Sequence, residues 1–209
     1  ENLEALEKGL PNLLQHVDNV KNVYGLPCVV AINAFPTDTK AELDLVESKC
    51  RELGVNVRLS EVWAKGGEGG LALAEEVVRL CDEPNHFQFV YDVNDSIEDK
   101  LNAIATKVYH ADGVVIAASA KKQLKQLTEL GFDKLPICMA KTQFSFSDDA
   151  SKLGAPRGFK ITVRDLKVNA GAGFLVAKTG DIMTMPGLPK VPSAEKIDVD
   201  ENGKITGLF

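Results

Sequence analysis

The sequence predicts an α/β fold: a parallel sheet with flanking helices, then a small α+β unit and a β-rich C-terminal part. Three observations support this prediction. Helical apolar spacing alternates with β-branched runs over residues 1–82, which is typical of parallel strands joined by helices. Shorter elements follow over residues 83–134, and strand-like alternation with glycine and proline turns fills residues 135–209. We therefore expect three domains with these bounds.

The stretch at residues 26–39 links the predicted fold to a predicted site. Residues 27–32 are almost all apolar, and several are β-branched, so a strand covered on both faces is expected. Phe35-Pro36 then forces an extended turn, and Thr39 opens a helix with Glu42 three residues on, which is a capping box. Ligands of open α/β sheets bind outside the carboxyl ends of the strands. This turn is therefore a predicted binding site.

Three helices and a second strand complete the first predicted domain. Pro11 suits the first position of a helix, and leucines and valines recur at helical spacing until Gly25 ends it. The second helix runs from Thr39 to Gly54, and the second strand covers residues 55–62. The third helix covers residues 71–81 and is expected to bury Ala74, Val77 and Val78.

The predicted elements after residue 83 are shorter. Helices are expected to begin at Ser96 and Ser119, since serine is a favoured N-cap residue. A terminal hairpin is expected over residues 197–209, about the turn Glu201-Asn202-Gly203. The other expected strands cover residues 87–91, 113–117, 135–140, 159–169 and 174–177.

Composition and charge exclude several classes of function. A chain of 209 residues with 44% hydrophobic content can bury a sizeable core. Its net charge of −6 gives no basic surface for nucleic acid, and no segment reaches the roughly 18 apolar residues of a membrane helix. We therefore expect a cytoplasmic protein that binds neither nucleic acid nor membrane. Because the chain begins at Glu1 without Met, we also expect it to be a fragment.

The cysteines and histidines do not form a metal-binding pattern. The four cysteines lack CxxC spacing, and three of them lie in apolar strand or helix patterns, so buried reduced thiols are expected. The three histidines are scattered singly along the chain. No metal site is therefore predicted in this sequence.

The glycine run at residues 65–70 precedes a helix and has two interpretations. Bare amides at a helix N-terminus favour anions, which would suit a phosphate. However, the run matches neither GxxxxGK[ST] nor GxGxxG, and Glu68 places a negative charge inside it. A flexible loop that lets backbone or ligand approach closely is the favoured interpretation.

Phe35 and Trp63 each follow a strand of the same predicted parallel sheet. Neighbouring strand ends would bring the two rings close enough to hold a flat heterocycle, and stacking contributes about 1–3 kcal/mol per base-like ring. The alternative, that both rings cap the core, fits the spacing equally well. Asn33 offers an amide donor and acceptor that match the edge of adenine, and stabilisation of the turn is the equal alternative for this residue.

Five sequence blocks carry a resemblance to a known family. They are VVAINAFPTDT at 29–39, EVWAKGGEGG at 61–70, LPICMAKTQFSFSDD at 135–149, NAGAGF at 169–174 and GDIMTMPGLPKVP at 180–192. With these blocks and the terminal GLF, the chain resembles the formate–tetrahydrofolate ligases, also called 10-formyltetrahydrofolate synthetases, essentially from end to end.

The resemblance implies an ATP-dependent ligase of one-carbon metabolism. Formate would attack the γ-phosphate of ATP to give formyl phosphate, and N10 of tetrahydrofolate would then attack the formyl group and release phosphate. The implied cofactors are ATP with Mg²⁺, which would neutralise charge in phosphoryl transfer, and a monovalent cation, K⁺ or NH₄⁺. The implied assembly is a homo-oligomer, a tetramer.

The resemblance also implies roles for individual residues. Phe35 and Trp63 would sandwich the pterin of tetrahydrofolate, and Leu59 would line the same cleft. Pro36 would lie where folate and the adenine end of the nucleotide approach. The adenine role of Asn33 is not part of the resemblance and stays an interpretation of its amide.

Family features without a match here limit the expected activity. The P-loop and the basic residues for formyl phosphate have no counterpart in this sequence. The resemblance therefore implies that this chain is the C-terminal portion of a longer family chain. Its catalytic residues are expected in the upstream remainder, and the sheet is expected to be the end of a P-loop-NTPase-like domain. We expect this chain to supply the pterin site and to be inactive as a ligase by itself.

Two further alternatives stay open at this point. The chain could be a non-catalytic α/β binding or assembly module, in which the same aromatic residues pack a subunit interface. The TQFSFSDD block at residues 142–149 either lines the active cleft or only satisfies loop backbone, and the second interpretation is favoured.

Overall fold

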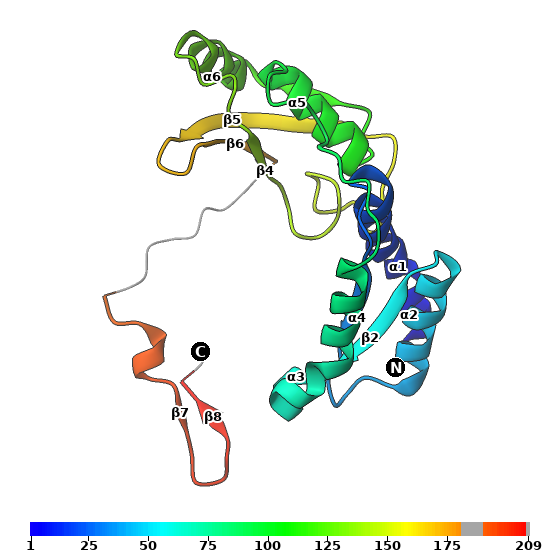
Figure 1. The fold of residues 1–209 in the computed structure, drawn as a ribbon. Coiled ribbons are helices and arrows are strands. Elements are labelled where there is room, and N and C mark those ends of the chain that lie inside the picture. The colour runs from blue at the N-terminus through cyan, green and yellow to red at the C-terminus, as the bar shows by residue number, and fades with distance from the viewer. Residues whose placement is uncertain (181–189, 208–209) are drawn as a thin grey trace.

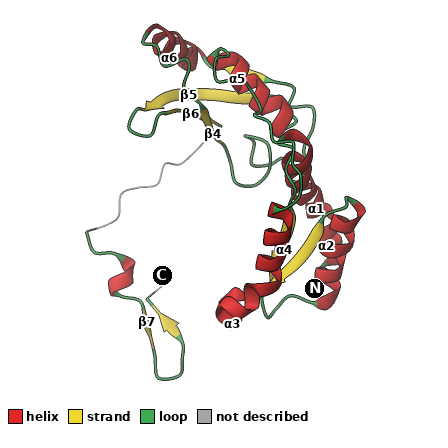
Figure 2. Cartoon of the chain, in the orientation of Figure 1, coloured by secondary structure: helices red, strands yellow, loops and turns green. Residues whose placement is uncertain are grey.

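The computed structural model describes residues 1–180 and 190–207 of the chain. A two-stranded parallel sheet lies between helices in the first half, and a four-stranded mixed sheet with helices beside it forms much of the second half (Figure 1). Helices and strands alternate along most of this path (Figure 2). The fold is therefore α/β, as the sequence predicts. None of the helices in the described residues has the length and apolar character needed to cross a membrane.

The first helix starts earlier than predicted. Helix α1 spans Leu3–Asp18 and continues as a π-helical turn, η1, at Asn19–Val23. Its N-cap is Asn2, whose side-chain oxygen accepts a hydrogen bond from the Ala5 amide at 3.0 Å. The predicted start at Pro11 is wrong, because Pro11 lies inside α1. It is tolerated there because it lies on the exposed side of the helix, where water can reach the carbonyl that proline leaves without a donor.

The parallel sheet consists of β1 at Val29–Asn33 and β2 at Asn56–Ser60, joined by helix α2 at Lys40–Glu52. One face packs on α1 and α2 through a buried cluster that contains Val17, Val30, Cys50, Val55 and Val57. The other face is only partly covered, and Ala31 of β1 is exposed. The prediction that this strand is covered on both faces is therefore wrong for the chain as described.

Helix α4 spans Leu71–Cys81, as predicted, but it presents an unexpected residue to the sheet. The expected burial of Ala74, Val77 and Val78 is wrong, since all three are exposed. The buried residue is Glu76, whose carboxylate accepts hydrogen bonds from Asn56 at 2.6 Å and from Arg58 at 2.8 Å. Asn56 and Arg58 of β2 point their hydrogen-bond donors to this face of the sheet. A carboxylate can be buried against them, because a buried charge is tolerated where donors pair with it.

The carboxyl group of Glu76 should make stability depend on acid pH. Hydrogen bonds from Arg79 and Asn56 lower its pKa from the ordinary value of 4.5 to about 2. The contribution of this group is thus complete above pH 4.5 and is lost as the pH falls from 4.5 towards 2. Glu76→Gln should remove the stability that the charged carboxylate contributes. The midpoint of thermal unfolding of the variant should therefore lie several degrees below that of the wild type at pH 7, and the two midpoints should approach each other near pH 2. Thermal scans from pH 7 to pH 2 check this, and equal losses at every pH would contradict it.

The second half is built on a sheet with strand order β3-β5-β6-β4. The β3–β5 and β4–β6 pairs are parallel, whereas β5 and β6 pair antiparallel. Helices α5 and α6 lie beside this sheet in Figure 1. Its elements are α5 Ile97–Ala103 with the π-helical turn η3 Ile104–Val108, β3 Val114–Ile116, α6 Ala118–Glu129, β4 Ile137–Ala140, β5 Ile161–Asn169 and β6 Phe174–Thr179.

Two predictions for this half are wrong. Residues 87–91 do not form a strand. They are tied to the end of the first helical segment by single backbone bonds, including the one from the Gln88 amide to the Tyr24 carbonyl at 3.1 Å, and a helix end offers no ladder for a strand. Ser119 is not the cap of α6, since the N-cap is Ala117. The Ser119 hydroxyl instead donates to the Arg164 carbonyl at 3.1 Å.

The C-terminal hairpin is confirmed, with β7 at Asp198–Val199 paired antiparallel to β8 at Ile205–Thr206 after a short 3₁₀ turn at Ser193–Glu195. Most of the sequence block at 180–192 lies outside the described residues. The four-stranded sheet takes β3 from before residue 134 and its other strands from after it, and the three domain bounds remain a prediction. Of the four cysteines, all free, only Cys50 is buried.

Candidate functional site

The aromatic pair lies where the two parallel strands end. Asn33 of β1 is paired with Ser60 of β2, so both strands finish at the same edge of the sheet. Phe35 follows the first strand and Trp63 the second. Their ring centroids are 5.9 Å apart and their planes are inclined by 21°, so the rings are stacked. The prediction that the strand ends bring these two rings together is confirmed.

Both rings are presented outward and do not close the core. Phe35 is 53% exposed and Trp63 is 55% exposed. Neither ring belongs to a buried hydrophobic cluster of the described residues. The interpretation that they cap the core is therefore not supported, and a stacked pair open to solvent is a surface to which a flat molecule can add.

The turn that carries Phe35 is fixed by a carboxylate. The Phe35 carbonyl accepts a hydrogen bond from the Asp38 amide at 3.0 Å, with exposed Pro36 as the second residue of the turn. The Asp38 carboxylate accepts from the Phe35 amide at 2.8 Å. Directly afterwards, Thr39 and Glu42 form the predicted capping box of α2. The Phe35 backbone is thus held between a closed turn and a capped helix.

Trp63 is positioned by a short helix and one hydrogen bond. Helix α3 spans Val62–Lys65, directly after β2. The indole Nε1–H of Trp63 donates to the Ala34 carbonyl at 2.7 Å. Since Ala34 precedes Phe35, this bond ties the second ring to the strand that carries the first. The pair is therefore held as one unit across the ends of β1 and β2.

The glycine run supports the same corner of the structure. It forms a 3₁₀ segment, η2, at Gly66–Gly70. The Glu61 amide donates to the Gly69 carbonyl at 3.0 Å, and a side chain at Gly69 would put its Cβ 2.5 Å from the Glu61 carbonyl carbon. The run therefore allows close backbone approach beside Trp63, in agreement with the favoured interpretation of its glycines.

The present spacing of the rings is too small for a sandwich. Two carbon layers in van der Waals contact lie about 3.5 Å apart, so a flat ring between two others needs them about 7 Å apart. The observed centroid distance of 5.9 Å is roughly 1 Å less than this. A ligand that enters between Phe35 and Trp63 must therefore separate them first.

Asn33 and Leu59 differ in their surroundings. The Asn33 side-chain amide has no hydrogen-bond partner among residues 1–180 and 190–207, so the structure gives it no role in the turn, which Asp38 holds instead. Leu59 is paired with Ile32, the residue before Asn33 in β1. Because successive residues of a strand point to opposite faces of the sheet, the side chains of Leu59 and Asn33 lie on opposite faces. Leu59 lines a hollow of about 320 Å³ next to Leu43.

The serine and aspartate groups of the TQFSFSDD block mostly satisfy loop backbone. The hydroxyls of Ser145 and Ser147 each accept a hydrogen bond from the amide two residues further on, at 3.1 Å. The Asp148 carboxylate accepts from the Thr162 amide at 2.8 Å. Phe146 is buried against the His16 ring, with centroids 4.5 Å apart. These groups thus satisfy loop backbone, but Thr142, Asp148 and Asp149 of the same block also line a hollow of about 550 Å³, so the two interpretations both stay open.

Sequence reasoning missed two parts of the site. Asp38 anchors the Phe35 turn, and the Ala34 carbonyl anchors the indole of Trp63. The signal for Asp38 was present, since Asp after a Pro-containing turn commonly bonds nearby backbone amides. The acceptor role of a backbone carbonyl leaves no signal in the sequence.

The comparison with known protein families extends beyond the aromatic corner. A family model described as formate–tetrahydrofolate ligase matches residues 1–209. The matched range includes all three sheets of the described residues, the glycine run and the strand ends that carry Phe35 and Trp63. Because the match covers the whole length of this sequence, the chain belongs to the formate–tetrahydrofolate ligase family.

Proposed function

We propose that this chain supplies the pterin-stacking part of an ATP-dependent ligase that joins formate to tetrahydrofolate, giving 10-formyltetrahydrofolate, ADP and phosphate. The family supports the ligase activity. The observation that carries the finer proposal is the stacked, outward-facing pair of Phe35 and Trp63 at the carboxyl ends of two parallel strands.

The proposed reaction needs the pterin to be held still. A formate oxygen attacks the γ-phosphorus of ATP, and ADP leaves, which gives formyl phosphate. The lone pair on N10 of tetrahydrofolate then attacks the formyl carbon, phosphate departs with the electron pair of the broken C–O bond, and N10 loses its proton. Holding one reactant in position lowers the entropic part of the barrier. Phe35 and Trp63 act here by binding and orientation.

The other site residues have smaller proposed roles. Leu59 and Pro36 supply apolar contact beside the aromatic pair, and Pro36 also lies on the side from which the nucleotide approaches. The unpaired amide of Asn33 is proposed to contact the adenine edge, which presents one donor and one acceptor. Asp38 keeps the Phe35 backbone in place through its hydrogen bond to the Phe35 amide.

Phosphoryl transfer is not assigned to residues of this chain. The sequence has no GxxxxGK[ST] loop. Within residues 1–180 and 190–207, no group of three or more His, Cys, Asp or Glu side chains could hold a metal ion. No step is therefore assigned to Mg²⁺, to a monovalent cation or to a phosphate-binding loop among these residues. We propose that the catalytic groups belong to an upstream remainder and that this chain alone is inactive.

The proposal is tested by titrating tetrahydrofolate against tryptophan fluorescence, since Trp63 is the single tryptophan of the chain. We expect saturable quenching, and Phe35→Ala should weaken binding about tenfold, because loss of one stacking ring removes roughly 1–3 kcal/mol. Phe144→Ala is the matched control, since Phe144 is 54% exposed and lies in a different loop. Free N-acetyltryptophanamide corrects for absorption by the folate.

A second candidate is the non-catalytic assembly module. It is favoured by exposed apolar residues on α4, where Leu71 is 59% and Val78 is 65% exposed. Under this candidate, Phe35→Ala would change the mass measured by light scattering and leave folate affinity unchanged. Saturable quenching that is equal in wild type, Phe35→Ala and Phe144→Ala would overturn the pterin site.

A further inference from the structure

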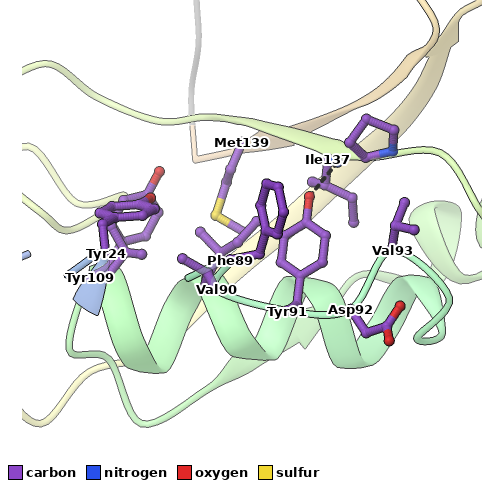
Figure 3. Close-up of a pocket in the computed structure, with 12 residues that line it drawn as sticks. Tyr24, Phe89, Val90, Tyr91, Asp92, Val93, Tyr109, Ile137 and Met139 are labelled. Atoms are coloured by element: carbon purple, nitrogen blue, oxygen red, sulfur yellow. Dashed lines mark hydrogen bonds between the residues drawn. The ribbon is translucent and has the colours of Figure 1, made fainter. Parts of the chain in front are cut away.

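A second cavity lies away from the aromatic pair and has a volume of about 730 Å³. It is bounded by residues 89–93, by the π-helical turn η3 and by strand β4 (Figure 3). The residues that carry the argument are Tyr24, Phe89, Tyr91, Asp92, Tyr109 and Met139. Neither Phe35 nor Trp63 lines this cavity. An inference about it therefore goes beyond the proposed function and does not depend on it.

The walls of this cavity suit a flat ring. Its volume is in the range of about 300–1,000 Å³ that is usual for small-molecule sites. Four aromatic rings line it, together with the Met139 thioether, and aromatic faces and sulfur both pack well against a planar ligand. Phe89 is 80% exposed, so it contributes a face to the cavity without being part of the core.

One end of the cavity has hydroxyl groups free to bind. Tyr24 and Tyr109 lie together at that end in Figure 3. Their hydroxyls have no hydrogen-bond partner within residues 1–180 and 190–207. Burial raises the pKa of Tyr109 to about 12, so its hydroxyl stays protonated at neutral pH. Tyr91 differs, because its hydroxyl accepts a hydrogen bond from the Ile137 amide at 2.9 Å and is fixed by it.

A negative charge lies at the rim of the opposite end, where the exposed Asp92 carboxylate is directed outward from the rings (Figure 3). Asp92 is the one charged residue among the described residues that line the cavity. Its Oδ1 accepts from the Asn94 amide at 2.8 Å and from Asn94 Nδ2 at 3.0 Å, and these bonds lower the pKa of Asp92. Its Oδ2 has no hydrogen-bond partner in the described part of the chain. Lys134 lies nearby but donates to the Asn94 carbonyl at 2.7 Å.

We propose that this cavity binds a planar aromatic cation, with its ring against the aromatic walls and a charged group that extends to the rim, where it reaches Asp92. Aromatic faces attract cations through the ring quadrupole, most strongly where the contact excludes water. The negative charge of Asp92 also attracts a cation. An aromatic anion of similar size meets repulsion at the same two features.

The test uses fluorescence polarisation of two planar probes with this chain, the cation proflavine and the anion anilinonaphthalene sulfonate. We expect one saturable proflavine site and at least about tenfold weaker binding of the anion. Phe89→Ala should weaken proflavine binding about fivefold or more, because it removes an aromatic wall. Phe144→Ala, an exposed phenylalanine outside the cavity, should leave it unchanged.

The charge is tested by Asp92→Asn, which keeps the oxygen that accepts from Asn94. It should weaken proflavine binding about threefold or more and leave anion binding equal or stronger. Circular dichroism melting confirms that each variant is folded. Equal proflavine affinities for wild type, Phe89→Ala and Asp92→Asn would overturn the proposal. Loss of the proflavine site in Phe35→Ala would also overturn it, because the dye would then be bound at the aromatic pair.

Discussion

Replacing Lys100 by methionine is expected to lower the free energy of unfolding of this chain by about 3 kcal/mol or more. Lys100 lies in α5 and is completely buried. Its ammonium group donates to the carbonyls of Val93 at 3.0 Å, Asp133 at 2.6 Å and Leu135 at 2.9 Å. All three of its N–H groups are therefore used.

Methionine has a similar length but no donor, so the three carbonyls would lose the donor that they share at this part-buried position. Each unsatisfied buried group costs about 1–3 kcal/mol. Desolvation lowers the pKa of Lys100, which shows that burial of its charge is itself unfavourable, and this offsets part of the loss. The total of about 3 kcal/mol corresponds to a fall of roughly 6–12 °C in the unfolding midpoint of a chain of this size.

Urea unfolding followed by circular dichroism measures this effect. Lys122→Met is the matched control, because Lys122 lies on the exposed side of α6 and surface substitutions usually change stability by no more than about 0.5 kcal/mol. If the two variants unfold at the same urea concentration, Lys100 does not hold together the loop before α5 and the loop before β4 as argued.

Gly69→Ala is expected to destabilise the aromatic corner by about 1–3 kcal/mol and to weaken tetrahydrofolate binding several-fold. A Cβ at Gly69 would lie 2.5 Å from the Glu61 carbonyl oxygen and 2.9 Å from the Val62 nitrogen. These are backbone atoms, so a side chain cannot simply rotate away. The chain just before Trp63 must shift, and the ring of Trp63 shifts with it.

Gly67→Ala provides the control within the same loop. A Cβ at Gly67 meets nothing within 4 Å, so this variant should keep both its stability and its folate affinity. Thermal unfolding and the Trp63 titration measure the two quantities separately. A Gly69→Ala variant that melts and binds like Gly67→Ala would show that the close approach to Glu61 does not position Trp63.

The sequence determined the local structure around the site. Thr39 and Glu42 predicted the capping box because both partners lie within one helical turn. The bounds of α4 followed from apolar spacing and the preceding glycines. The contact between Phe35 and Trp63 followed from parallel pairing, since neighbouring parallel strands end at one edge.

Other features depended on partners that are distant in sequence. Pro11 looked like a helix start because it fits that position, and only the earlier cap at Asn2 made it an interior residue. Val77 and Val78 were predicted to be core residues, but Glu76 faces the sheet instead, because Asn56 and Arg58 of β2 donate hydrogen bonds to its carboxylate. Residues 87–91 have strand-like composition, yet a strand forms only where another strand offers a ladder.

Lys100 is the clearest case of a residue whose surroundings depend on distant partners. Within its own helix, it reads as an ordinary surface lysine, and nothing nearby in the sequence marks it as buried. Its three acceptors come from two loops, one before α5 and one before β4, and only the tertiary structure brings them around a single ammonium group. Local hydrogen bonds and apolar spacing were thus determined by the sequence alone, because they involve neighbours along the chain. Burial, ring spacing and long-range polar partners were decided by packing, because they require elements that the chain brings together only when it folds.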